Sequence, residues 1–398
     1  MIRPTLDHRI PALDVLRGIA VSGILLANLA AFGLPLASVI DGTGLPTPTL
    51  REQYAMVLTQ MLVTGKFRSV LAILFGVGLW LQYVKRSKTP GNWPGGYLKR
   101  TAWLGALGLV HVTALWYGDI LLTYAIVAAI ASVWVWWTDR QLRGLVGIGF
   151  GVMAIAGIVL LGISYNASGV DRVTAGLPTP ATEIAVYGQH SYLDQVWFRI
   201  ESLPTTLSSS LALVPLVLPL FALGILLARA DYFSLAAPPQ LRRNVLLVGL
   251  GLGIPLNGLA LIGPTTFQGY DFRLAFEIFF GPVLALGYVG LGVMLAERAR
   301  GPIVRVLAVV GRLALTTYLL QSVLATAVFY SWGLGWFGRL DRATLLFVAP
   351  PIWLATALFA LGWSRQFALG PVEWLWRSLA EGTRLPLRSR PLSADQQP

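Results

Sequence analysis

The sequence predicts an all-α, polytopic integral membrane protein, built as a bundle of about ten transmembrane helices. Of its 398 residues, 56% are hydrophobic and only 12% are charged, whereas soluble domains contain about 45–50% apolar and about 25% charged residues. Apolar runs long enough to cross a bilayer, which takes about 17–25 helical residues, recur along the whole chain. These observations exclude an ordinary soluble enzyme and a disordered protein, and the absence of cysteine excludes a disulfide scaffold.

Ten apolar runs are expected to form the membrane helices. The first run is too long for the core of a signal peptide and nine more follow it, so we expect an anchored helix. Gly118 and Asp119 leave only a tight turn between the third and fourth runs. The runs are residues 15–36, 69–84, 101–117, 120–137, 143–164, 207–228, 244–262, 275–295, 313–331 and 345–363.

The distribution of Lys and Arg predicts that the N-terminus and the C-terminus are both cytoplasmic. With ten helices, 22 of the 30 basic residues fall in inner segments and eight in outer segments, as the positive-inside rule requires. The net charge of +12 is then explained by topology and by contact with anionic lipids. We therefore expect membrane lipids as partners and no nucleic acid, and the oligomeric state stays open.

Residues 1–382 are expected to form a single transmembrane domain with two long outer loops, 37–68 and 165–206. Within the first loop, residues 54–62 are expected to form a short amphipathic helix on the outer surface. The second loop is long enough to carry a function of its own. Residues 383–398 contain Pro, Ser and Arg and are expected to form a disordered basic cytoplasmic tail.

Few polar residues lie inside the apolar runs, and each is a candidate functional residue because burying it in hydrocarbon is costly. His111 is the only histidine inside a predicted helix, and the turn that follows places Asp119 one to two helical turns beyond it. A carboxylate beside an imidazole fixes the tautomer and prepares the ring as a general base. Asn28, in the first helix, is expected either to hydrogen-bond a neighbouring helix or to orient a reacting group.

Further polar residues lie near the ends of predicted helices. Asp14 and Arg17 share one helix face, where they either cap and anchor the helix or receive an anionic cofactor at the cytoplasmic mouth. Lys66 and Arg68 oppose the overall charge bias and are expected to bind a carboxylate, a lipid phosphate or an anionic substrate. No metal site is expected. The ninth helix has a polar flank that should face the bundle interior and, with Lys66 and Arg68, is expected to bind the substrate. This flank is formed by Thr316, Tyr318, Gln321 and Ser322.

The order of several motifs resembles the YeiB-like family of bacterial membrane proteins, named for domain of unknown function 418. The resemblance implies a multi-pass protein of the bacterial cytoplasmic (inner) membrane, and it extends over essentially the whole chain. In the first half the motifs are residues 13–18 with Asn28, 65–68, 74–78, 108–111 and 118–121. In the second half they are residues 311–312, 315–322 and 370–377.

That family is similar in its first helix to the transmembrane acyltransferase superfamily, which includes the lysosomal heparan-glucosaminide N-acetyltransferase and the acyltransferase-3 O-acetylases. The similarity implies that acyl-CoA binds from the cytoplasm and that the acyl group passes through the bundle to an acceptor hydroxyl or amine. Asp14 and Arg17 match the superfamily's Asp-x-x-Arg-Gly pattern, and Asn28 matches an Asn of the lysosomal enzyme. The superfamily's catalytic histidines have no counterpart here, so His111 is expected to replace them.

Three functions remain open on these grounds. The first is a membrane-embedded acyltransferase that binds no resident cofactor, uses acyl-CoA as co-substrate and modifies a small-molecule, glycan or lipid acceptor. The second is a transporter or flippase of a small or lipid-linked solute, with Lys66, Arg68 and the ninth helix along its path. The third is a non-catalytic scaffold or sensor that uses the loop 165–206. For the first, the expected catalytic residues are His111, Asp119 and Asn28, and the expected acyl-CoA ligands are Asp14, Arg17, Lys99 and Arg100.

Overall fold

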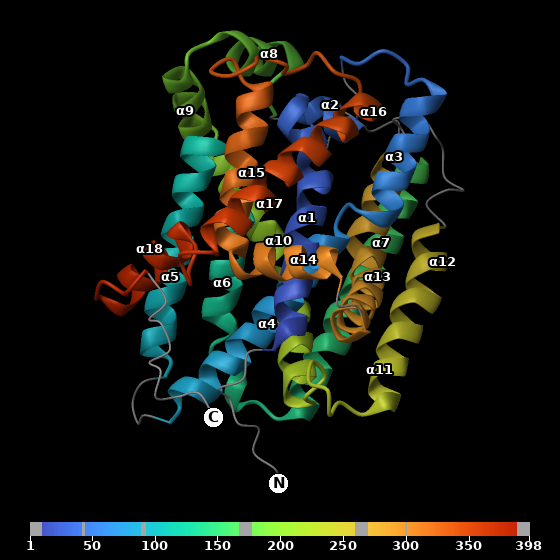
Figure 1. Ribbon diagram of the computed structural model, residues 1–398. Coiled ribbons are helices and arrows are strands. Elements are labelled where there is room, and N and C mark those ends of the chain that lie inside the picture. Colours follow the sequence, from blue (N-terminus) through green and yellow to red (C-terminus); the bar gives the residue numbers. More distant parts are fainter. Residues whose placement is uncertain are drawn as a thin grey trace.

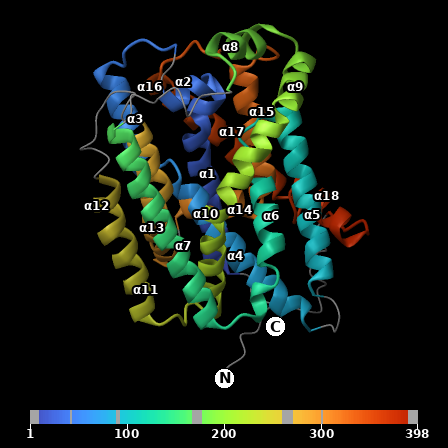
Figure 2. The same cartoon turned by 180° about the vertical axis from the view of Figure 1, so that it is seen from behind.

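The computed structural model describes residues 10–41, 44–88, 93–166, 177–258, 270–298 and 301–387, without the side chains of 41, 160–166 and 270–278. Every regular element in these residues is a helix, which confirms the all-α prediction. Most of the helices stand side by side as a bundle (Figure 1). We call the end at which α1 (Pro11–Gly33) begins the basic end, and the end covered by α8 (Pro180–Gln189) and α9 (Tyr192–Glu201) the capped end (Figure 2).

Six helical segments of the described chain are long and apolar enough to cross a membrane, or seven if the bent pair of α14 (Pro302–Arg312) and α15 (Ala314–Phe329) counts as one. The six are α1 (Pro11–Gly33), α3 (Leu50–Leu62) with α4 (Lys66–Arg86), Asp139–Val159 of α7 (Asp139–Asn166), α10 (Leu203–Arg229), Phe279–Arg298 of α13 (Tyr270–Arg298), and α16 (Arg342–Leu345) with α17 (Ala349–Trp363).

Helices also form in the described parts of the remaining predicted runs, but they are shorter or interrupted. They are α5 (Gly95–Val110), α6 (Leu121–Ala131), α11 (Pro239–Leu246) with α12 (Gly253–Gly258), and α15; α14, which precedes α15, lies outside the ten predicted runs. The number of ten membrane spans is therefore not confirmed.

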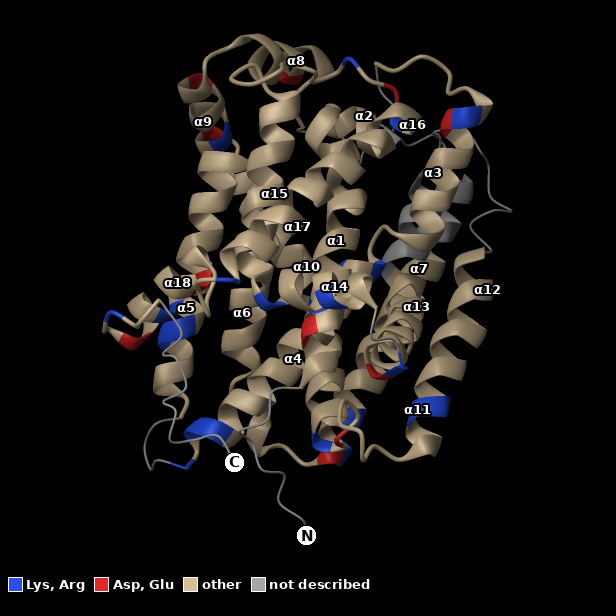
Figure 3. Cartoon of the chain, viewed as in Figure 1, with Lys and Arg blue, Asp and Glu red and all other residues tan. Residues whose placement is uncertain are grey.

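The sides of the bundle are apolar, as contact with lipid requires. Ile148, Val152 and Ile155 of α7 are exposed, as are Leu354 and Leu358 of α17. An apolar surface of this extent marks a membrane-facing region. Lys and Arg gather mainly in the half of the bundle toward the basic end (Figure 3). This asymmetry agrees with the charge bias in the sequence, and the side that faces the cytoplasm stays a prediction.

Helix α14 lies across the bundle and turns by 91° into α15 (Figure 1). Where α14 crosses α1, both helices have a glycine. A Cβ atom on Gly18 would lie 2.0 Å from the carbonyl oxygen of Leu307, and one on Gly311 would lie 1.8 Å from that of Asp14. Because only glycine permits this approach of two backbones, the crossing holds the start of α15 beside the first turns of α1.

Both predicted outer loops are largely helical. The first contains α2 (Leu36–Asp41) and α3, and α3 continues toward α4 along the side of the bundle rather than lying on an outer surface (Figure 1). The second contains α8 (Pro180–Gln189) and α9 (Tyr192–Glu201), which cover the capped end. The sequence predicts that Lys66 lies in the first loop. In the structure Lys66 is the first residue of α4, and its side chain is buried.

The beginning of the predicted disordered tail is attached to α18 (Pro371–Glu381). The Nε1–H group of Trp374 donates to the carbonyl oxygen of Leu385 at 2.7 Å, and the N–H of Leu385 donates to Oγ of Ser378 at 3.3 Å. The rest of the predicted tail, residues 388–398, lies outside the described residues.

A buried carboxyl group joins α8 to the start of α2. Glu183 is only 3% exposed, and its Oε2 accepts a hydrogen bond from the N–H of Leu36 at 2.6 Å. Burial raises the pKa of Glu183 from 4.5 to about 7, against the opposing effect of the Leu36 hydrogen bond. The capped end therefore contains a carboxyl group that changes charge near neutral pH.

We predict that Glu183 lowers the stability of the folded protein as the pH rises. Because its folded pKa of about 7 exceeds the ordinary value of 4.5, the folded state binds the proton more tightly. The stabilisation is full below about pH 4.5 and is lost as the pH rises through about 7, a change of about 3 kcal/mol. In thermal unfolding in detergent, the E183Q variant should exceed the wild type in Tm at pH 8, with a smaller difference at pH 5. Identical pH profiles for the two proteins would contradict the prediction.

Candidate functional site

Three polar side chains from separate segments meet inside the bundle. Nδ1 of His111 lies 3.0 Å from Oδ1 of Asp119, and Nε2 of His111 lies 2.9 Å from Oγ of Ser322. His111, Ser322 and Asp119 are 1%, 2% and 7% exposed. This order of carboxylate, imidazole and hydroxyl is the order found in catalytic triads. We refer to these three residues as the Asp-His-Ser set.

Asp119 is held in place by the backbone of α6. Its Oδ2 accepts a hydrogen bond from the N–H of Leu122 at 2.8 Å, in the first turn of the helix, where a carboxylate is favoured. A Cβ atom on Gly108 would lie 2.8 Å from the nitrogen of Leu122 and 2.9 Å from Oδ2 of Asp119. Glycine at this position therefore lets α5 and α6 approach closely enough for the carboxylate to reach His111.

His111 begins a π-helical turn, His111–Leu115, that follows α5. Such single turns occur frequently at functional sites. The end of this turn is bound by Arg199 of α9, which is buried. Its Nε and Nη2 donate to the carbonyl oxygens of Thr113 and Ala114 at 2.8 and 3.0 Å. The guanidinium group thus satisfies carbonyls that the helix end leaves without an intrahelical partner.

We predict that the ring of His111 carries its proton on Nδ1. This nitrogen faces Oδ1 of Asp119 at 3.0 Å, and an ionised carboxylate only accepts hydrogen bonds. Nε2 is then left to accept from the hydroxyl of Ser322, whose oxygen lies 2.9 Å away. This is the direction of proton transfer that a general base requires.

Two aromatic rings shield the Asp-His-Ser set. The rings of Tyr318 and Trp116 lie 5.2 and 6.5 Å from that of His111, measured between centroids, and both side chains are buried. Trp116 is itself fixed: it stacks on Phe32 at 3.9 Å, and its Nε1–H donates to the carbonyl oxygen of Ala31 at 3.3 Å. His111 is therefore enclosed in this structure, with only 1% of its surface exposed.

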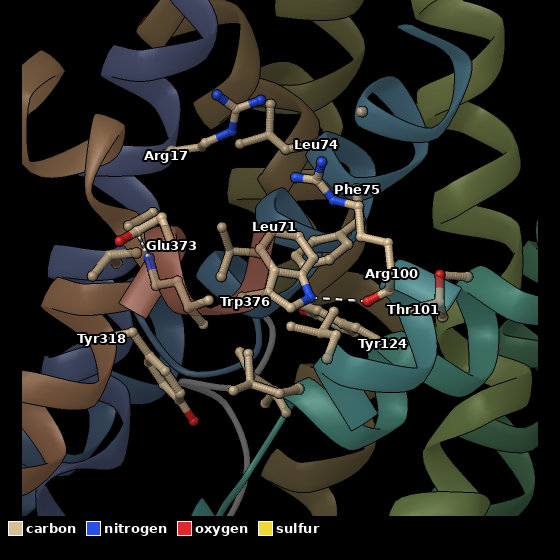
Figure 4. Close-up of a pocket in the computed structure, with 18 of the residues that line it drawn as sticks. Arg17, Leu71, Leu74, Phe75, Arg100, Thr101, Tyr124, Tyr318, Glu373 and Trp376 are labelled. Atoms are coloured by element: carbon tan, nitrogen blue, oxygen red, sulfur yellow. Dashed lines mark hydrogen bonds between the residues drawn. The ribbon is translucent and has the colours of Figure 1, made fainter. Parts of the chain in front are cut away.

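A cavity of about 240 Å³ lies next to Tyr318, and we call it the arginine pocket. Its walls are mostly apolar, and Tyr318 connects it with the Asp-His-Ser set. Figure 4 shows the guanidinium groups of Arg17 and Arg100 on one side of the pocket and Tyr318 on the opposite side, with Trp376 between them. The charged residues that line it are Arg17, Arg100, Arg312, Arg377 and Glu373.

The surroundings of the arginines position them and leave the pocket positive. Nη1 of Arg17 lies 3.2 Å from Oδ1 of Asp14. The guanidinium of Arg100 lies 4.1 Å above the ring of Trp376, whose Nε1–H donates to the Arg100 carbonyl oxygen at 2.9 Å. Nε of Arg100 has no hydrogen-bond partner in the described part of the chain. Counting Asp14 beside Arg17, four guanidinium groups stand against two carboxylates, and this excess attracts an anion, while the apolar walls fit a hydrocarbon chain.

Glu373 and Thr316 cap each other's helices. The carboxylate of Glu373, in α18, accepts from the N–H groups of Leu315 and Thr316 at 2.8 and 3.1 Å and from the Thr316 hydroxyl. In return, Oγ1 of Thr316 accepts from the N–H of Val372 at 3.1 Å. Each side chain satisfies orphan donors at the start of the other's helix. The pair therefore fixes where α15 begins and how it is oriented.

We predict that E373A destabilises the protein by about 3 kcal/mol, because two buried N–H groups and one hydroxyl lose their acceptor. The matched control is E381A on the same helix, since Glu381 is largely exposed and lies 3.4 Å from Arg86; an exposed ion pair contributes about 0–1 kcal/mol. Thermal unfolding in detergent compares the two. Equal shifts for both variants would contradict the capping role of Glu373.

Several residues predicted from the sequence do meet at this site. The proposed partners His111 and Asp119 are in contact, and Ser322, expected to bind substrate, completes the set. Arg17 and Arg100, expected to bind the phosphates of acyl-CoA, both line the arginine pocket.

Other predicted residues lie elsewhere. Asn28 has no described interaction with His111, and Lys99 is exposed outside the pocket, where a Cβ atom on Gly382 would lie 3.2 Å from its Nζ. The Nζ of Lys66 donates to the carbonyl oxygen of Gln60 at 2.5 Å. At Arg68 the main-chain oxygen accepts from the Tyr124 hydroxyl at 2.6 Å.

The polar flank of the ninth predicted helix is buried as expected, but its members differ in role. Thr316 serves as a cap, Tyr318 lines the arginine pocket, and Ser322 contacts His111. Nε2 of Gln321 is buried without a hydrogen-bond partner among the described residues.

Three residues that line the arginine pocket are not among the site residues predicted from the sequence: Arg312, Trp376 and Arg377. Their signal was present, because each lies in one of the ordered motifs. Nothing in the sequence, however, shows that α14 and α18 both border the same cavity.

The fold and the site define a helical membrane protein with a buried Asp-His-Ser set next to an arginine-lined pocket. The family described as "Protein of unknown function (DUF418)" matches residues 227–383, which include Ser322 and Glu373. The chain is 31% identical over 386 residues to "Uncharacterized protein YeiB" of Escherichia coli (strain K12), covering 92% of this chain and 95% of the relative. It is 28% identical over 395 residues to "Uncharacterized protein YxaH" of Bacillus subtilis (strain 168), covering 95% and 96%.

The chain therefore belongs to the YeiB-like family, as its motifs predict. A third relative, the "Uncharacterized 39.9 kDa protein in amylase 3'region" of Bacillus acidopullulyticus, is 26% identical over 392 residues, covering 96% of both chains. The similarity to the transmembrane acyltransferase superfamily stays a prediction.

Proposed function

We propose that the protein is a membrane-embedded acyltransferase, which moves an acyl group from an anionic donor such as acyl-CoA to a hydroxyl or amine acceptor. The observation that carries the proposal is the buried Asp-His-Ser set, with contacts of 3.0 and 2.9 Å on the two nitrogens of His111. Asp119 orients the ring and stabilises the imidazolium that forms, while Nε2 takes the proton of the attacking group.

The arginine pocket supports binding of the donor. Guanidinium groups bind phosphates by charge-assisted hydrogen bonds, and the apolar walls accommodate the chain that leads to the acyl group. Arg100 and His111 are eleven residues apart along α5 and the turn that follows it, which corresponds to about 16 Å at the helical rise. An extended donor with its phosphates at the arginines can therefore direct its carbonyl carbon toward His111.

The sidedness of the bundle agrees with such a transfer. Arg17 and Arg100 lie on the side of the pocket away from Tyr318 (Figure 4), and Lys and Arg concentrate toward the basic end (Figure 3). With the basic end in the cytoplasm of a bacterium, acyl-CoA enters from the side where it is made and the acceptor is on the far side of the inner membrane.

A second candidate function is transport of an anionic amphiphile, and one observation favours it. The 91° bend between α14 and α15 lies beside the arginine pocket, and discontinuous helices form the binding sites of many transporters. In that case, the protein would move its ligand without breaking a covalent bond.

We predict that the purified protein in nanodiscs releases free CoA from an acyl-CoA in the presence of an acceptor alcohol, measured with a thiol-reactive dye. H111A should lower kcat by about 10²–10⁴-fold, because the general base is lost. R100Q should instead raise KM for acyl-CoA by about 10-fold or more, since one charge-assisted contact to the donor is removed.

The matched control for R100Q is R305Q, because Arg305 is exposed on α14 and does not line the pocket. Full turnover by H111A would show that His111 is not the base. Flux of an anionic lipid into proteoliposomes, without release of CoA from any acyl-CoA, would contradict acyl transfer and favour transport.

A further inference from the structure

The hydroxyl group in contact with the base belongs to the protein itself. Nε2 of His111 is 2.9 Å from Oγ of Ser322, and within the described residues no other hydroxyl is hydrogen-bonded to the imidazole. We infer that Ser322 is a nucleophile and that the acyl group is carried through the bundle as an ester on its Oγ. This inference rests on the proposed acyl transfer and specifies its route.

The hydroxyl of Ser322 differs from its neighbours on α15. Hydroxyl groups in helices usually donate to the carbonyl oxygen one turn earlier, and Thr317 and Thr326 do so at 3.0 and 2.8 Å. For Ser322 the same distance, to the carbonyl oxygen of Tyr318, is 3.4 Å. The shorter contact is the one to His111, so the hydroxyl is directed at the base rather than at its own helix.

Ser322 is also placed to receive a group from the arginine pocket. Tyr318, which lines the pocket, precedes Ser322 by four residues, and these positions share a helix face. Movement of the Tyr318 ring would therefore open the pocket toward Oγ of Ser322. The ring of Trp116 lies 6.5 Å from that of His111 and belongs to the same apolar core as Tyr187 of α8, at the capped end.

The burial of the Asp-His-Ser set favours a reaction in two steps. Direct transfer needs donor and acceptor in the site together, whereas His111, Asp119 and Ser322 are at most 7% exposed and the neighbouring rings of Tyr318 and Trp116 are buried too. A covalent ester lets the donor leave past Tyr318 before the acceptor enters past Trp116. Each ring then excludes water during the half-reaction in which it stays closed.

In the first step, Oγ of Ser322 bonds to the carbonyl carbon of the thioester while the carbon–sulfur bond breaks. The hydroxyl proton passes to Nε2 of His111 and from there to the sulfur, so CoA leaves as its thiol. In the second step, the acceptor oxygen or nitrogen attacks the ester carbon, its proton passes through Nε2 to Oγ, and the ester bond breaks. Asp119 stabilises the imidazolium in both steps, and no further reactant is required.

The test is to identify the modified residue by peptide mass spectrometry of the full chain in nanodiscs. Two probes are used separately, a fluorophosphonate, which reacts with activated serines, and an acyl-CoA. We expect both to modify Ser322, with the acyl adduct released by hydroxylamine. H111A should slow modification by about 10²-fold or more. The matched control is S69A, because Ser69 is buried and donates to the Gly65 carbonyl oxygen at 2.8 Å, and it should leave modification unchanged.

Two variants at position 322 distinguish loss of the nucleophile from loss of the fold. S322A should abolish modification, and gel filtration shows whether it stays folded. S322C keeps a nucleophile at the position in a chain that otherwise has no cysteine, and it should be acylated as a thioester.

The failure of this inference can be told apart from the failure of acyl transfer. If the wild type transfers acyl groups and S322A transfers them at the same rate, Ser322 is not acylated and transfer is direct. If the wild type releases no CoA from any acyl-CoA, acyl transfer fails. In that case, modification of Ser322 by the fluorophosphonate would still support an activated serine. If the fluorophosphonate also failed to modify Ser322, the nucleophilic role of Ser322 would be overturned as well.

Discussion

The contact between Asp119 and His111 is the interaction on which the site depends. In an apolar bundle, a carboxylate and an imidazole are each costly to bury unless they are paired, and the surrounding structure provides that pairing. The glycine at Gly108 brings α5 and α6 together, the N–H of Leu122 binds the second carboxylate oxygen, and Arg199 binds the end of the π turn. These three features of the structure therefore hold Asp119 and His111 in contact.

The position of α15 is the second requirement, because Ser322 reaches His111 only if this helix starts and turns correctly. The glycine crossing of α1 and α14, at Gly18 and Gly311, places its start, and the mutual capping by Glu373 and Thr316 orients it. Several motif residues of the second half of the chain are therefore architectural. They also bring α14 and α18 to the arginine pocket, so that one arrangement of helices builds both the pocket and the nucleophile contact.

The sequence predicts the helical membrane fold and the pairing of His111 with Asp119, because periodicity, composition and a short connecting turn are local properties. It does not predict the contact between His111 and Ser322, which lie 211 residues apart. It also does not predict that α14 lies across the bundle, since an apolar run has the same composition whether it crosses a membrane or turns within it. For the same reason, Lys99 and Arg100 look equivalent in the sequence, although only Arg100 lines the pocket.

The claim that His111 is the general base is tested most directly by ¹⁵N NMR of histidine-labelled protein, which determines the tautomer of His111. The chain has three histidines, and the H111Q variant identifies the resonance. We predict a neutral ring protonated at Nδ1. The Nε2 signal should shift in S322A, because the hydrogen bond between Nε2 and the Ser322 hydroxyl is lost. A proton on Nε2, with Nδ1 unprotonated and no response to S322A, would contradict it.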